Sequence, residues 1–105
     1  MIVTAADSGT TRTMKVGDSL VLELAENPSS GYRWAFERLD ESRVLIVDAG
    51  FRSAGDQPGA GGVATWTLQA AAPGKTTVRL KRWRHWEGDR SIVERFALNL
   101  DVAPA

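Results

Sequence analysis

The sequence predicts an all-β protein. Apolar and polar residues alternate with a period of two over several short stretches, a pattern typical of strands with one buried face. Turns rich in glycine, proline and aspartate separate these stretches, and none of them shows a helical period. Because short strands at such intervals are typical of sandwiches, we expect an immunoglobulin-like β-sandwich of about seven or eight antiparallel strands.

Composition narrows the function classes that the chain can serve. It has 105 residues, 43% of them hydrophobic and 25% charged, which suits a single globular domain over residues 1–105. Thirteen basic residues balance thirteen acidic ones, so no overall field attracts nucleic acid or an anionic membrane. Without cysteine there is no thiolate nucleophile, and one histidine cannot build a histidine-rich metal site. We therefore expect no metal and no cofactor, and a fold held together by packing alone.

We expect no export signal in the N-terminal residues. Residues 1–4 lead into polar residues instead of the apolar core of a signal peptide, and no apolar run approaches membrane-spanning length. A cytoplasmic location is expected for the chain as written, and a periplasmic or secreted one if a signal has been removed. The sequence leaves these two locations open.

The first half of the chain is expected to hold five strands, over residues 2–3, 11–16, 19–25, 32–39 and 44–51. In the third of them Leu20, Leu22 and Leu24 share one face. In the fourth, we place Trp34 in the core and leave Tyr32 open between core and contact. The fifth has apolar residues on both sides at its start, so we expect it to be buried on both faces over part of its length.

The second half alternates in the same way. After a long loop over residues 53–62, strands are expected over 63–71, from residue 76 onward, and over 92–102. The inward residues expected in the first and last of these are Ala64, Trp66, Leu68, Ala70, Ile92, Phe96, Leu98, Leu100 and Val102. The middle strand leads into a cluster of arginine and tryptophan over residues 84–91.

Three irregular loops stand out from this frame, at residues 26–31, 53–62 and 84–91. In the first, Pro28 fixes its own φ and Gly31 allows a left-handed conformation, so the loop should be stiff and shaped. Alternate connections in a sandwich fall at the same end, and the three loops are separated by two connections each. We therefore expect them to form one contiguous edge.

Each loop carries a short motif. The first is Asn27-Pro28-Ser29-Ser30-Gly31-Tyr32-x-Trp34, the second is Gly59-Ala60-Gly61-Gly62, and the third is Arg84-His85-Trp86. Together they resemble the motifs of the chagasin-type inhibitors of cysteine peptidases, which are Asn-Pro-Thr-Thr-Gly-Tyr-x-Trp, Gly-x-Gly-Gly, and Arg-Pro-Trp or Arg-Pro-Phe. They occur in the family's order. Serine replaces both threonines, and His85 replaces the proline.

This resemblance implies a monomeric, reversible, non-covalent protein inhibitor of papain-like cysteine peptidases, with no catalytic residues of its own. The three motifs would be the peptidase-binding residues. Pro28 would stiffen a wedge at the catalytic cysteine and histidine, and the glycines would let the backbone approach a substrate groove closely. Trp86 would be the large anchor, with Arg84 offering a planar donor fork beside it.

The same residues allow other interpretations. Basic residues around Trp83 and Trp86 could bind nucleic acid, but Glu87 and Asp89 lie within the same run and the net charge is zero. A catalytic triad of Ser29 or Ser30 with His85 and Asp89 lacks any nucleophile-elbow motif. The runner-up from another class is an immunoglobulin-like adhesion or carbohydrate-binding domain that uses the same loop edge.

Overall fold

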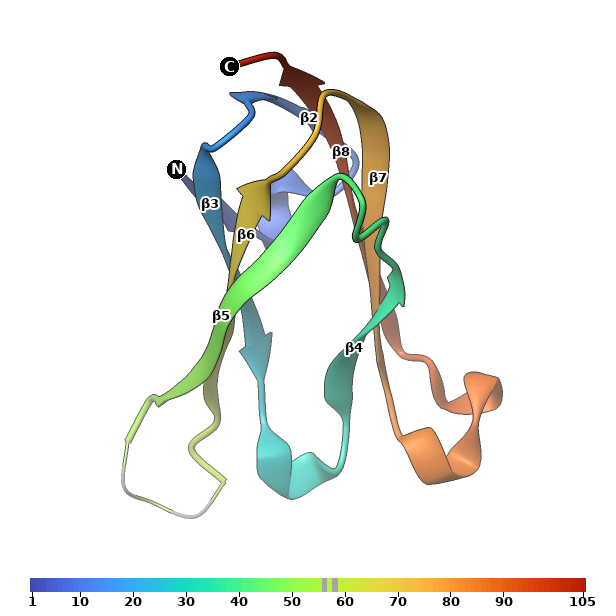
Figure 1. Ribbon diagram of the computed structural model, residues 1–105. Helices are drawn as coiled ribbons and strands as arrows, with labels where there is room; N and C mark the ends of the chain where they lie inside the picture. The colour runs from blue at the N-terminus through green and yellow to red at the C-terminus, as the bar shows by residue number, and fades with distance from the viewer. Residues whose placement is uncertain (56, 58) are drawn as a thin grey trace.

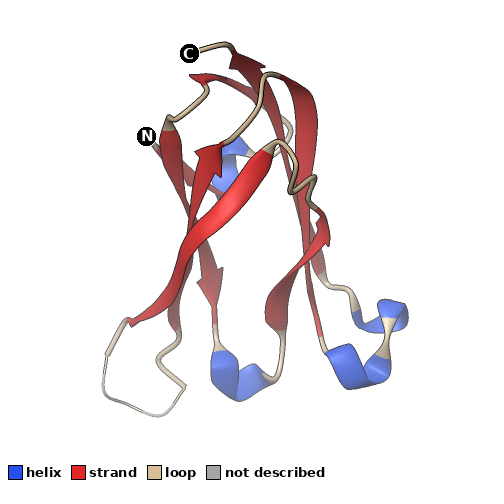
Figure 2. Cartoon of the chain, in the orientation of Figure 1, coloured by secondary structure: helices blue, strands red, loops and turns tan. Residues whose placement is uncertain are grey.

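The computed structural model describes residues 1–55, 57 and 59–105, which leaves Asp56 and Pro58 of the expected 53–62 loop outside the described residues. Within these residues, eight strands form two four-stranded sheets packed face to face, as expected for the sandwich (Figures 1 and 2). The first sheet has the order β1 (Ile2–Thr4), β3 (Ser19–Glu26), β6 (Gly62–Ala70), β5 (Val44–Ser53). The second has the order β2 (Thr11–Lys15), β8 (Glu94–Ala103), β7 (Gly74–Trp83), β4 (Arg33–Arg38).

The expectation of purely antiparallel pairing is wrong for two strand pairs. β1 pairs with β3 in parallel, and β2 pairs with β8 in parallel, so both sheets are mixed. The reason lies in the connections. β1, β2 and β3 alternate between the two sheets, so none of them forms a hairpin with its neighbour in sequence. Without a hairpin to impose direction, the alternation of residues is the same for parallel and antiparallel pairing.

The core lies between the two sheets and is built by the expected alternation. All three leucines of β3 are buried, as are Leu68 and Ala70 of β6 and the four apolar inward residues of β8 from Phe96 to Val102. Trp34 is buried at 8% exposure, which confirms its assignment to the core. Trp66 is only partly buried and packs edge-on against Phe36, with ring centroids 5.7 Å apart. It supports the core from one side instead of filling its centre.

Two details of the expected strands are wrong. β5 is not buried on both faces: only Val44 is buried, and Leu45, Ile46 and Val47 are each more than 40% exposed. β5 lies at the edge of its sheet, so it has a neighbouring strand on one side only. Its register with β6 also shifts between Ile46 and Asp48. The last strand begins at Glu94, which leaves Ile92 in the preceding loop and outside the core cluster.

Helical structure in the described residues is limited to four single turns of 3₁₀-helix. They are η1 (Ala5–Asp7), η2 (Pro28–Ser30), η3 (His85–Glu87) and η4 (Asp89–Ser91). No helix within the described ranges has the length and apolar character needed to cross a membrane. Three of the four turns lie in the loops that carry the first and third motifs, where they give those loops a defined shape.

Candidate functional site

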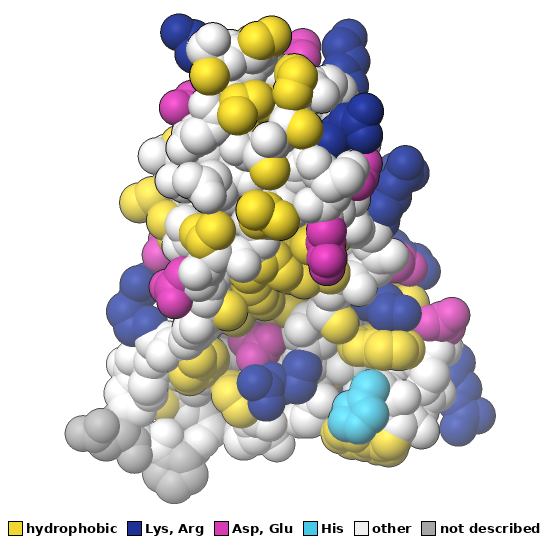
Figure 3. All heavy atoms as spheres, in the orientation of Figure 1, with side chains coloured by type: hydrophobic (Ala, Val, Ile, Leu, Met, Phe, Trp, Pro, Cys, Tyr) yellow, Lys and Arg dark blue, Asp and Glu magenta, His cyan; other side chains and the backbone are white. Residues whose placement is uncertain are grey.

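The three motif-bearing loops lie together at one end of the sandwich, as expected (Figure 1). The loop over 26–31 crosses from β3 in the first sheet to β4 in the second. The loop over 53–62 closes the β5–β6 hairpin of the first sheet, and the loop over 84–91 closes the β7–β8 hairpin of the second. The crossing loop therefore has a hairpin tip on either side. Hydrophobic and basic side chains are both visible at this end of the molecule (Figure 3).

The first loop is held in shape by its own polar groups. The side-chain oxygen of Asn27 accepts hydrogen bonds from the Ser29 N–H at 3.1 Å and the Ser29 hydroxyl at 2.7 Å, capping η2. The Ser30 hydroxyl donates to the Asn27 carbonyl at 2.7 Å and accepts from the Tyr32 N–H. Pro28 occupies the first position of the turn, and Gly31 ends it with φ of 81°. Both serine hydroxyls thus serve the shape of the loop.

Asn27 also joins the first loop to the second. Its side-chain amide donates to the Gly59 carbonyl at 3.2 Å, across 32 residues of sequence. Gly61 adopts φ of 72°, and a Cβ there would lie 3.5 Å from the Glu26 carbonyl oxygen and 3.6 Å from Asn27 Cβ. Gly61 therefore lies against the first loop of its own molecule.

Gly62 has a different role from the other glycines. A Cβ at this position would overlap the Arg52 carbonyl oxygen of the paired strand and lie 2.7 Å from the Phe51 ring. Glycine is thus required where β5 and β6 meet, whatever the protein binds. Ala60, in contrast, is exposed.

The third loop closes over the first from the other side. Arg84 donates from Nε and Nη2 to the Ser30 carbonyl oxygen, at 3.3 and 3.0 Å, and its guanidinium lies over the Tyr32 ring at 4.3 Å. Its Nη1 pairs with Glu87. The ring of Trp86 covers Gly31 so closely that a Cβ there would lie 2.9 Å from Trp86 Cη2. Trp86 is still 62% exposed, so most of its surface is available to a partner.

These contacts place two of the residues expected to bind a peptidase. Arg84 was expected to offer a planar donor fork beside Trp86, and its guanidinium donates to Glu87 and to the Ser30 carbonyl within the molecule. Tyr32 lies between core and contact, half-buried beneath Arg84. The exposed motif residues are Pro28, Ser29, Gly59, Ala60, His85 and Trp86. The half-buried ones are Asn27, Ser30, Gly31, Tyr32, Gly61, Gly62 and Arg84.

Sequence reasoning missed two residues of this edge. Glu26 and Ser91 are the buried polar side chains of the described chain, at 6% and 8% exposure, and each lies at the base of a loop. A signal existed for Glu26, because the alternation of Leu20, Leu22 and Leu24 continues inward to residue 26. For Ser91 the sequence holds no comparable pattern.

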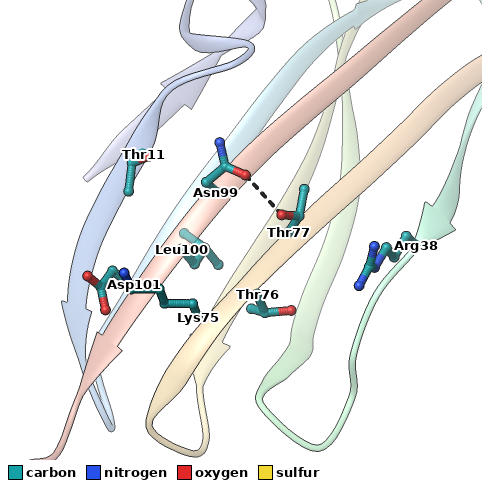
Figure 4. Close-up of a pocket in the computed structure, with 8 residues that line it drawn as sticks. All are labelled: Thr11, Arg38, Lys75, Thr76, Thr77, Asn99, Leu100 and Asp101. Carbon is teal, nitrogen blue, oxygen red and sulfur yellow. Dashed lines mark hydrogen bonds between the residues drawn. The ribbon is translucent and has the colours of Figure 1, made fainter.

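The catalytic triad and the metal site considered above are not formed at this edge by the described residues. Ser29 donates to Asn27, and Asp89 pairs with Lys81 at 3.1 Å, so no triad with His85 is formed. The residues described contain no group of three potential metal ligands. A depression of about 340 Å³ on the outer face of the second sheet is lined by strand residues, among them Thr77 and Asn99, and by none of the motif residues (Figure 4).

Comparison with known proteins agrees with this geometry. Residues 13–100 match the family described as Chagasin family peptidase inhibitor I42. The chain is 32% identical to chagasin from Trypanosoma cruzi over 103 residues. The aligned region covers 93% of this chain and 94% of chagasin. It superposes on the cysteine protease inhibitor EhICP2 from Entamoeba histolytica with a TM-score of 0.85 at 20% identity, covering 97% and 93% of the two chains. It also superposes on PbICP-C, solved in complex with falcipain-2, with a TM-score of 0.64 at 13% identity, covering 100% and 90%. The chain therefore belongs to the chagasin family of peptidase inhibitors.

Proposed function

We propose that this protein inhibits papain-like cysteine peptidases reversibly and without a covalent bond, by occluding the active-site cleft with the loops 26–31, 53–62 and 84–91. Members of its family inhibit enzymes and are not enzymes themselves. The observation that carries the proposal is that side-chain hydrogen bonds join all three motif-bearing loops. Asn27 links the first loop to the second, and Arg84 links it to the third. A rigid edge of this kind loses little conformational entropy when it binds.

The geometry divides the proposed binding residues into two roles. The exposed residues, with Pro28 at the centre and Trp86 at one side, would enter the cleft and contact the peptidase. The half-buried ones, above all Asn27 and Arg84, would hold the edge in shape. The side chains of Ser29 and Ser30 are hydroxyls engaged with Asn27 and offer no electrophile to which a catalytic thiolate could add, so the thiolate would be covered and not trapped.

Titration of papain with the purified protein tests this proposal. We expect competitive inhibition that is reversed by dilution, from a protein that runs as a monomer in size-exclusion chromatography with light scattering. Mass spectrometry of the complex under denaturing conditions should return both chains at their unmodified masses. A covalent adduct, or loss of inhibition as Ser29 is cleaved, would contradict the mechanism. Full papain activity at saturating protein would favour the adhesion or carbohydrate-binding alternative.

A further inference from the structure

The two buried polar side chains of the described residues, Glu26 and Ser91, both lie where a motif-bearing loop leaves the sandwich. Neither can be a main contact for a partner, because each is more than nine-tenths covered in the free protein. Burying a carboxylate or a hydroxyl costs free energy unless its hydrogen bonds are made. We therefore expect both side chains to make hydrogen bonds within the loop edge itself.

Glu26 bridges the two ends of the first loop. Its Oε1 accepts from Arg33 Nε at 2.7 Å, and its Oε2 accepts from the Trp34 N–H at 2.8 Å. Glu26 is the last residue of β3, and Arg33 and Trp34 begin β4. One carboxylate thus sets the distance between the strand that enters the loop and the strand that leaves it. The Trp34 indole N–H, which donates to the Ala25 carbonyl at 2.9 Å, makes a second bridge beside it.

Two crevices flank this stem. A crevice of about 450 Å³ lies on the side of the second loop, and another of about 410 Å³ lies on the side of β5. Glu26 lines both of them. With a crevice on either side, the hydrogen bonds of Glu26 act together with the packing of the Trp34 ring to fix the separation of the strand ends.

Ser91 has the matching position in the third loop. Its hydroxyl oxygen accepts from the Arg84 N–H at 3.0 Å. The same hydroxyl lies within donating distance of the Arg84 carbonyl, at 2.9 Å, and of the Gly88 carbonyl, at 2.7 Å. Ser91 therefore ties the end of the loop to its beginning at Arg84, the residue that reaches across to the first loop.

We propose that Glu26 and Ser91 are positioning residues of the inhibitory edge, which keep the first and third loops in the binding-competent shape before a peptidase arrives. This inference rests on the proposed function. If the competent shape is populated only in part, the apparent association constant equals the intrinsic one multiplied by the populated fraction. Loss of either residue should then slow association with the peptidase while the dissociation rate changes little. Loss of a direct contact has the opposite signature, a faster dissociation.

The test uses Glu26→Gln and Ser91→Ala, measured by stopped-flow association with papain, by dissociation after dilution, and by amide hydrogen exchange of the free protein. Glu23→Gln is the matched control, because Glu23 lies on the same strand, pairs with Arg52 at 3.3 Å, and is not at a loop. We expect association to slow about tenfold for each variant and exchange to rise within residues 27–32 or 85–90, while the paired β3–β6 and β7–β8 amides stay protected.

The outcomes separate the possible roles. Unchanged loop exchange, or an affinity loss confined to the dissociation rate, would overturn the positioning role, and so would faster exchange spread evenly over both sheets. If Glu26→Gln does not fold, Ser91→Ala still tests the idea through its own loop. Failure of the wild-type protein to inhibit papain would overturn the proposed function. The exchange measurement needs no peptidase, so it separates that failure from a failure of Glu26 and Ser91 to hold the loops in shape.

Discussion

The guanidinium of Arg84 donates two hydrogen bonds to the carbonyl oxygen of Ser30, from Nε at 3.3 Å and from Nη2 at 3.0 Å, across 54 residues of sequence. This contact joins the third loop to the centre of the first. The arginine of the third motif therefore holds the inhibitor's own backbone. Arginine suits the task because its planar fork offers two donors in fixed geometry.

Replacing Arg84 by lysine should weaken papain inhibition by about tenfold or more, because an ammonium cannot make both bonds to Ser30 and also stack on Tyr32. The melting temperature should change little, since the contact lies outside the core. Inhibition constants and thermal melts check both statements. Arg12→Lys is the control: Arg12 pairs with Asp7 at 2.6 Å, near the first 3₁₀ turn and away from the motifs. Equal effects of the two variants would contradict a special role for Arg84.

Trp86→Ala should cost about 2 kcal/mol or more of binding free energy and leave the fold intact, because the ring is 62% exposed in the free protein. Trp34→Ala should do the reverse, lowering the free energy of unfolding by about 3–5 kcal/mol, since its ring is buried in the core. Chemical denaturation and papain titration of both variants measure the difference. A Trp86 variant that melts early yet binds normally once folded would show that contact and core have been exchanged.

The glycines of the second loop should respond differently to valine. Gly62→Val should destabilise the fold, because its Cβ would overlap the backbone of β5. Gly61→Val should reduce affinity with a smaller loss of stability, since φ of 72° and contact with Asn27 disfavour a β-branched residue at the edge. Ala60→Val is the control, because Ala60 is exposed. Thermal melts and inhibition constants of the three variants test this order, and an unaffected Gly61 variant would remove the second loop from the binding edge.

His85→Pro should be tolerated and should stabilise the third loop by about 0.5 kcal/mol. His85 is the first residue of η3, a position where the N–H has no partner within the turn and where a fixed φ is favourable. The imidazole is exposed and touches the edge of Trp86, with centroids 5.1 Å apart, so part of that contact would be lost. Denaturant unfolding and papain titration should show higher stability and inhibition at least equal to wild type. A loss of stability would mean that the backbone at this residue does not have the φ of proline.

The loop edge could be predicted from the sequence more completely than the scaffold behind it. Turn residues such as Pro28 and Gly31 act locally, so their pattern is readable along the chain. The parallel pairing of β1 with β3 and of β2 with β8 could not be predicted, because apolar and polar residues alternate in the same way in parallel and antiparallel strands. The exposure of β5 was missed because an apolar run such as Val44 to Val47 is typical of a central strand, and only the strand order places it at an edge.

The inner organisation of the edge was harder still. Arg84 was expected to offer a donor fork beside Trp86, and only the position of the Ser30 carbonyl shows that this fork is engaged within the molecule. Glu26 continues the inward alternation of β3, but the role of a carboxylate there follows only from its hydrogen bonds with Arg33 and the Trp34 N–H. Such roles depend on contacts between distant segments, which a linear pattern does not contain.

Both termini lie at the end of the sandwich opposite the three loops (Figure 1), and the molecule is 45 Å along its longest axis. A fusion partner, an affinity tag or a biosensor surface attached through either terminus would thus be held away from the three loops. Two copies joined by a flexible linker would present both edges outward, free to engage two peptidase molecules fixed on one surface. The gain in retention over a single copy would then be governed by the length of the linker.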